Sequence, residues 1–159
     1  MKPILILALA TLAIPCCAQS GSNAQVFSGQ KVTSQLAALA QSAKSSGSGG
    51  AMLGDYKSHA IELSVRTSSG GAEIHAHYDD IIVVTGGRAT LVTGGSVVNS
   101  KTNGAGETKG SSIQDGKSQT IVKGDIVHIP AATPHQLILA PGDVYSAIVI
   151  KVKELSQLP

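Results

Sequence analysis

Two histidines separated by one residue stand in the segment EIHAH, residues 73–77. In an extended chain every second side chain points to the same face, so Glu73, His75 and His77 would lie side by side. Neighbouring imidazoles present two nitrogen ligands to one metal ion, and Asp80 follows closely with carboxylate oxygens. Histidine and carboxylate ligands together suit Mn, Fe, Ni or Zn. The segment therefore predicts a site for a divalent transition metal.

A third imidazole has to come from elsewhere in the chain, and His135 is the best candidate because it directly follows a proline-bounded turn at 130–134. His128 alternates with apolar neighbours and should point away from the interior, and the spacing of His59 requires no ligand role. We therefore predict His75, His77, Asp80 and His135 as the metal ligands. An isolated His-x-His pair is more often a surface or structural feature, so the prediction depends on His135.

The sequence offers more than one carboxylate ligand. Only two residues separate His77 from Asp80, so Asp79 is an alternative ligand. Glu73 is another, because alternation places it on the face of the two histidines. A site of three histidines and water is the remaining arrangement.

The elements that must position these residues begin with a helix over 28–44. Val32, Leu36 and Leu39 recur at helical spacing and form one apolar stripe, which should pack on the rest of the domain or on a second subunit. Ser28 is a suitable N-cap. The run SSGSGG at 45–50 predicts the end of the helix and a flexible connector.

Beyond residue 54 the pattern is that of short strands separated by turn residues. Asp115-Gly116 predicts a two-residue hairpin, and the polar, glycine-rich stretch 99–110 predicts a long exposed loop. Many short strands at regular spacing predict an all-β sandwich or closed barrel. The expected strands span residues 60–66, 80–85, 88–93, 95–98, 111–114, 118–122, 125–129, 135–139 and 144–152.

Two segments, 71–87 and 124–135, resemble the two signature motifs of the cupin superfamily. In the first, His75 and His77 match the paired histidines, Asp80 stands where the family has Glu, and Gly87 closes the motif. In the second, the spacing of Gly124, Pro130 and His135 matches, while Ala132 replaces a glycine and Leu139 a frequent asparagine. The resemblance covers about residues 55–152.

The resemblance implies a cupin-type jelly-roll β-barrel after one N-terminal amphipathic helix, with a metal inside near one mouth. It also implies a small-molecule ligand or substrate and a homodimer formed through sheet edges. Cupins include oxygenases, isomerases, lyases, binding modules and storage proteins, so the fold alone does not choose among a metal enzyme, a non-catalytic binding module and a structural barrel.

The first 18 residues predict a secretory signal peptide, because Lys2 precedes an apolar run and small residues stand at Cys16 and Ala18. The expected mature chain starts at Gln19 and is exported to the periplasm or the extracellular space, with a lipoprotein anchored at Cys16 or Cys17 as the alternative. The expected organisation is signal peptide 1–18, helix and connector 19–54, barrel 55–152 and tail 153–159.

Composition excludes several classes of partner. The 159-residue chain suffices for one domain with a real core. Without Lys2, 11 basic residues face 10 acidic ones, which gives no basic surface for nucleic acid and none for an anionic membrane after signal cleavage. The chain has no Trp and one Phe, so stacking platforms for bases are few.

Overall fold

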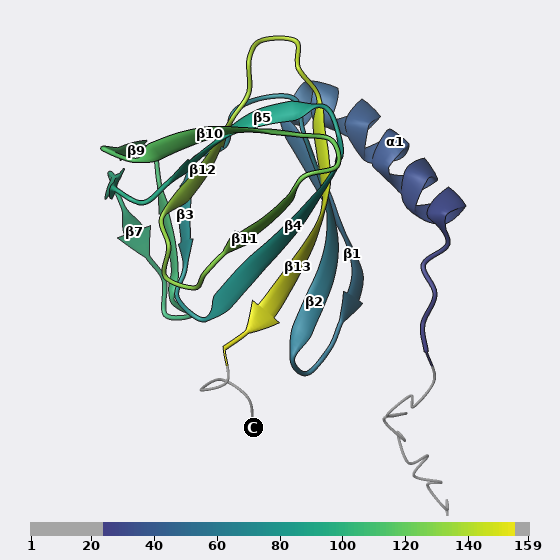
Figure 1. The fold of residues 1–159 in the computed structure, drawn as a ribbon, viewed down its shortest axis with the longest axis horizontal. Helices are drawn as coiled ribbons and strands as arrows, with labels where there is room; N and C mark the ends of the chain where they lie inside the picture. The colour runs from purple at the N-terminus through teal and green to yellow at the C-terminus, as the bar shows by residue number, and fades with distance from the viewer. Residues whose placement is uncertain (1–23, 155–159) are drawn as a thin grey trace, which may run out of the picture.

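The computed structural model describes residues 24–154 (Figure 1). The predicted signal peptide, the expected start at Gln19 and most of the C-terminal tail lie outside the described residues. The predicted helix is confirmed as α1 (Gly29–Ser46): the Ser28 side chain accepts a hydrogen bond from the Lys31 N–H at its start. Gly47 ends the helix with φ 80°, and its N–H donates to Ala43 O at 2.8 Å. No helix within residues 24–154 is long and apolar enough to span a membrane.

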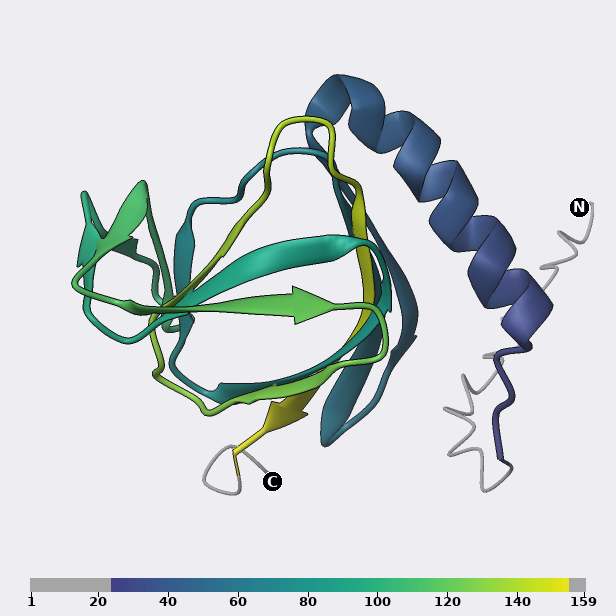
Figure 2. The same ribbon diagram turned by 45° about the horizontal axis from the view of Figure 1, so that its top comes forward.

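The strands build two antiparallel sheets that face each other around a common interior (Figures 1 and 2). The first has the order β1 (Ser48–Asp55), β2 (His59–Arg66), β13 (Tyr145–Lys153), β4 (Tyr78–Gly86), β11 (Ile126–Ile129). The second has the order β10 (Lys117–Val122), β5 (Arg88–Thr93), β12 (His135–Ile138), β3 (Ala72–His75), β8 (Glu107–Gly110), β7 (Lys101–Thr102). β6 (Ser96–Val98) and β9 (Ser112–Gln114) form a separate pair. The predicted all-β jelly-roll barrel after one helix is confirmed.

The helix lies on the outside of the first sheet, against β1 and β2 (Figure 2). Its Val32 and Leu36 line a groove together with Val65 of β2. Leu39 packs on Gly49 of β1, where an added Cβ would lie 3.3 Å from Leu39 Cδ2. The apolar stripe thus packs on the barrel, as the helical spacing predicted.

Apolar side chains of both sheets fill one part of the barrel interior. Two members of this buried core, Ile82 and Leu91, also line a cavity inside the barrel. The members of the core are Ile82, Val84, Ala89, Leu91, Ile121, Ile129, Leu139, Tyr145 and Ala147.

The expected flexible connector at 45–50 needs correction, because β1 already begins at Ser48. Ser48 pairs with Arg66 and Gly50 with Ser64 in a regular antiparallel register. The glycines here let the helix pack closely on the strand and do not serve as a linker, so the sheet starts before residue 55.

The expected long loop at 99–110 is also wrong: β7 and β8 form a hairpin there, and β8 pairs with β3. The Asn103 side chain shapes its turn by accepting hydrogen bonds from the N–H groups of Ala105 and Glu107, both at 3.0 Å. Polar and glycine residues thus make a tight turn within a hairpin.

The expected hairpin at Asp115-Gly116 is not formed by its flanking strands. β9 pairs with β6, and β10 pairs with β5. The consecutive strands β9 and β10 therefore run antiparallel to the consecutive strands β5 and β6. Asp115 has φ 58° and lies beside Gly95, where this long pair of strands is interrupted. The dipeptide is therefore an irregularity within one extended strand pair.

Candidate metal centre

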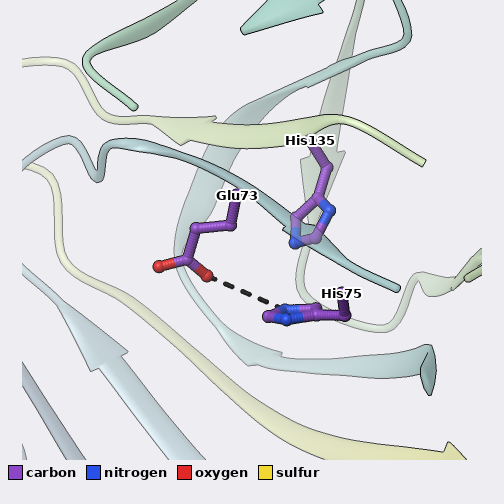
Figure 3. Close-up of side chains that lie close together, drawn as sticks. All are labelled: Glu73, His75 and His135. Atoms are coloured by element: carbon purple, nitrogen blue, oxygen red, sulfur yellow. Dashed lines mark ion pairs between the residues drawn. The ribbon is translucent and has the colours of Figure 1, made fainter. Parts of the chain in front are cut away.

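His75 and His135 meet inside the barrel because their strands are neighbours. β12 pairs with β3 at His135 and Glu73, so the start of one strand lies beside the end of the other. Both histidines are 8% exposed, and their ring centroids lie 5.1 Å apart. Figure 3 shows the two imidazoles and the Glu73 carboxylate pointing toward one another. These three side chains offer donor atoms that all lie within 4.8 Å of one another.

Asp80 of β4 brings a second carboxylate to the same place and is 5% exposed. Its Oδ2 lies 3.4 Å from His75 Nε2 and 3.8 Å from His135 Nε2, and Glu73 Oε2 lies 3.8 Å from His75 Nε2. Ligands about 2.1 Å from a tetrahedral ion stand about 3.4 Å from one another. The distances from His75 Nε2 to the two carboxylates are close to this value, although Asp80 is not in the group whose donor atoms all lie within 4.8 Å of one another.

The other ring nitrogen of each histidine is held by a separate acceptor. His75 Nδ1 lies 2.5 Å from Glu107 Oε2, and His135 Nδ1 lies 3.0 Å from the carbonyl oxygen of Thr133. With a proton on Nδ1, the neutral form of each ring has its Nε2 lone pair directed at the cluster. Such outer contacts fix the tautomer and orientation of metal-binding histidines.

The turn at 130–134 ties these elements together. Ala132 adopts φ 59°, the conformation for which the family motif has glycine, and its N–H donates to His75 O at 2.7 Å. Asp79 accepts a hydrogen bond from the Ala131 N–H at 2.8 Å and lies 3.0 Å from His128 Nε2. Asp79 therefore supports the turn and does not reach the cluster, and the bond from His128, followed by that from Ala131, lowers its pKa.

His77 is not among the clustered side chains, and the expected shared face of residues 73–77 needs correction. β3 ends at His75, and Ala76 and His77 form the turn into β4. The alternation of side chains stops where the strand stops. His77 instead lines an open hollow with Tyr78 and Lys153.

The remaining histidines lie away from the cluster. The side chain of His128 is 57% exposed and pairs with Asp79. His59 stacks on Tyr56 with ring centroids 4.7 Å apart. The structure thus brings together His75, His135, Asp80 and Glu73 of the residues that the sequence singled out.

Burial and charge set the protonation of the cluster. Burial lowers the pKa of His135 and favours the neutral imidazole, the form that binds metals. Burial also lowers the pKa of His75, but the hydrogen bond that the protonated ring donates to Asp80 and the nearby Glu107 carboxylate outweigh it and leave the pKa raised. Burial raises the pKa of Asp80, but the His75 bond and the Lys151 charge outweigh it, so this carboxyl stays ionised.

Two functional side chains were not foreseen from the sequence. Glu107 lies in the stretch expected to be a loop, and Lys151 donates from Nζ to Asp80 Oδ1 at 2.9 Å. A signal for Lys151 exists, because a lysine within the apolar run 144–152 has to find a polar partner. Glu107 had no such signal, because its contact depends on the pairing of β8 with β3.

The cluster lies at the wall of a cavity of about 190 Å³ inside the barrel. Ile82, Leu91 and Val149 form apolar parts of its wall, and β2 contributes a polar row. Pockets for drug-sized ligands measure roughly 300–1,000 Å³, so this cavity suits a smaller molecule.

No protein-family model matches this chain, and no curated protein sequence matches it at a significant level. Solved structures do resemble it. The DMSP lyase DddQ from Ruegeria pomeroyi DSS-3 superposes with a TM-score of 0.50 and 16% identity, over 68% of this chain and 48% of that longer one. KdgF from a Halomonas species gives a TM-score of 0.49 at 13% identity, over 69% of this chain and 83% of that one.

A cupin superfamily protein from Desulfitobacterium hafniense DCB-2 gives a TM-score of 0.48 at 14% identity, over 67% of this chain and 78% of that one. At 16% identity the likeness to the DMSP lyase DddQ concerns the architecture alone and leaves the chemistry to the site. The order of strands in the two facing sheets leads to the same architecture. The fold of this chain is therefore that of the cupin, or double-stranded β-helix, proteins.

Proposed function

We propose that this chain is an exported, metal-binding cupin that binds or transforms a small molecule inside its barrel. Glu73, His75 and His135 hold a divalent Mn, Fe, Ni or Zn ion, and Asp80 is the fourth ligand or the general base. The observation that carries the proposal is the convergence of three buried or half-buried donor groups within 4.8 Å at a cavity wall. Two histidines with a carboxylate are a ligand set of such metals.

The residues around the ion define what the site can do. A bound divalent ion supplies a Lewis acid for an oxygen of the ligand, or a place to activate water or dioxygen. Asp80, kept ionised by its hydrogen bond with His75 and by the charge of Lys151, is able to accept a proton from a molecule in the cavity. Many isomerases and lyases use such a proton transfer, and a metal-dependent oxygenase is the third enzymatic alternative.

A non-catalytic binding barrel is the second candidate, and the Lys151–Asp80 contact favours it. This ammonium group already balances the most buried carboxylate of the cluster. The cluster is thus able to persist as an ion-pair network without a metal, as in a binding or structural barrel.

The proposed place of action is the periplasm or the extracellular space. The apolar run after Lys2 and the small residues before Gln19 support it. Mass spectrometry of exported protein tests this part: a mature N-terminus at Gln19 supports it, and a lipidated Cys16 or Cys17 supports membrane anchoring instead.

Elemental analysis of protein purified without added metal tests the metal site. The proposal predicts near-stoichiometric transition metal in the wild type, strong loss in His135→Ala and full retention in the control His128→Ala. Equal metal content in both variants, or none in the wild type, contradicts it. Oxygen uptake with candidate ligands then separates an oxygenase from the other classes.

A further inference from the structure

The inner face of β2 carries a row of polar side chains along the cavity. Glu62, Ser64 and Arg66 all line it, while Leu63 and Val65 between them are buried on the other face of the strand. Charged groups seldom face a barrel interior unless they have a partner there. These polar side chains of β2 therefore favour a polar ligand in the cavity.

Of the two cations that line the cavity, Arg66 has no carboxylate partner among the described residues. No carboxylate among residues 24–154 lies within 4.0 Å of its guanidinium nitrogens. Lys151, the other cation, is paired with Asp80. Glu62 is on the same face of β2 but lies four residues away, about 13 Å along the strand. A guanidinium group in this setting is available to a ligand.

The position of this guanidinium is built by the backbone at Gly70. A Cβ added to Gly70 would lie 2.7 Å from Arg66 Nη1 and 2.8 Å from Cζ, so an alanine here would displace the end of the arginine side chain. The N–H of Gly70 donates to Leu137 O at 2.9 Å, and its carbonyl accepts from Gln136 Nε2 at 2.8 Å. Gln136 itself is 8% exposed. The Gly70 backbone beside the guanidinium is thus held by two hydrogen bonds.

The Gly70 backbone lies close to the histidine cluster. The N–H of Gly70 is hydrogen-bonded to Leu137, and Leu137 follows His135 by two residues on β12. Two residues of a strand span about 7 Å. Both the guanidinium and the cluster line the same cavity of about 190 Å³. A molecule of a few carbons is therefore able to touch both.

The charge of the cavity favours an anion once a metal is bound. Its wall carries the carboxylates of Glu62, Glu73 and Asp80 and the cations Arg66 and Lys151. A divalent ion would leave positive charge in excess, which the carboxylate of a ligand balances. The planar guanidinium donates two parallel N–H bonds to a carboxylate, a strong and specific pairing.

We infer that the ligand of this barrel is a small organic acid, with one carboxylate on Arg66 and a second oxygen group at the histidine cluster. This inference rests on the proposed function, since it names the ligand class of the same site. Arg66 recognises the carboxylate of the ligand, and the distance between Arg66 and the histidine cluster determines which ligand length fits.

Calorimetric titration with succinate and glutarate tests the inference, and the uncharged succinamide serves as the matched ligand. The wild type should bind a diacid and not the diamide. Arg66→Gln should weaken diacid binding at least tenfold, and Arg66→Lys should weaken it less. Gly70→Ala should also weaken it, because the added Cβ displaces the guanidinium while its charge remains.

The control is Arg88→Gln, because Arg88 is 70% exposed and pairs with Asp143 outside the cavity. It should bind the diacid like the wild type. Equal binding of diacid and diamide, no binding of either diacid, or wild-type binding by Arg66→Gln overturns the inference. If Arg66→Gln fails to fold, diacid binding by Arg66→Lys and Gly70→Ala tests the inference instead, and wild-type binding by both variants overturns it.

Metal analysis of the same samples separates the two proposals. Metal present in all variants without any effect of Arg66 on binding refutes the ligand class and leaves the metal site standing. Diacid binding through Arg66 to a chain that holds no metal refutes the metal site and supports the ligand class.

Discussion

Lys151 and Asp80 stand directly opposite each other on β13 and β4, and the lysine Nζ lies 2.9 Å from Asp80 Oδ1. The other oxygen of the same carboxylate lies 3.4 Å from His75 Nε2. One buried carboxylate is therefore shared between a built-in ammonium group and the histidine cluster. A metal ion that uses Asp80 as a ligand has to compete with this lysine.

Lys151→Met should raise the affinity for Zn²⁺ about tenfold, because it frees Asp80 for the ion. It should also lower the free energy of unfolding of the metal-free protein by about 1–3 kcal/mol, because a buried carboxylate loses its partner. Calorimetry with Zn²⁺ and urea unfolding in a chelator measure the two effects. Lys101→Met, at an exposed position, is the control. Unchanged affinity would remove Asp80 from the ligand set.

Glu107→Ala should weaken metal binding about 10- to 100-fold, because His75 loses the acceptor that holds its Nδ1. Glu107→Gln keeps an acceptor oxygen and should recover part of the affinity. Competition titration against a chelating dye measures the series. Glu62→Ala, which removes a cavity carboxylate outside the contacts of His75, should have little effect. Equal losses in Glu62→Ala and Glu107→Ala would argue for a general charge effect.

Alkaline pH should destabilise the protein through Tyr145. Burial raises the pKa of this phenol to about 12, with a smaller opposing effect of Arg66. The folded state favours the neutral phenol over the charged form. The stabilisation that this gives is fully present below a pH of about 10, the ordinary pKa of tyrosine, and is lost as the pH rises toward 12.

Urea unfolding of the wild type and Tyr145→Phe between pH 9 and 11 isolates this effect. The wild type should lose roughly 1 kcal/mol more than the variant by pH 11. At neutral pH the variant should be about as stable as the wild type, because the Tyr145 hydroxyl has no hydrogen-bond partner among the described residues. Parallel pH curves for the two proteins would show that the phenol does not titrate in this window.

The helix should be sensitive to side-chain size at Ala43, which is fully buried against the barrel. Its carbonyl accepts a hydrogen bond from Thr67 Oγ1 at 2.6 Å, so the helix end has little freedom to move. Ala43→Leu should lower the free energy of unfolding by about 1–3 kcal/mol through overpacking. Ala38→Leu, on the exposed face of α1, should change it little. Denaturant unfolding compares the two, and equal stabilities would mean that α1 is not docked.

The architecture was largely predictable, because the alternation of apolar residues and the turn signals depend on local sequence. The helix at 28–44 and the strand at 88–93 show this, since their patterns are complete within the segment. The glycine-rich residues 48–50 were misassigned, because their strand depends on pairing with β2 and on close packing of Leu39.

The site was predictable only in part. The motif spacing singled out His75, His135 and Asp80, and alternation singled out Glu73 as an open alternative. The position of His77 depends on where β3 ends, and one residue of difference turns a side chain to another face. Lys151 and Arg66 reach the cavity, and Glu107 reaches His75, through pairings between distant strands, which local spacing does not contain.

A crystal structure with anomalous data at the metal absorption edge tests the central claim most directly. The account predicts one ion with His75 Nε2 and His135 Nε2 each about 2.0–2.2 Å away, a carboxylate of Glu73 or Asp80 in the same shell, and His77 outside it. An ion bound by His77 would contradict the account. So would a crystal soaked with the metal ion in which the His75 and His135 rings share no ion.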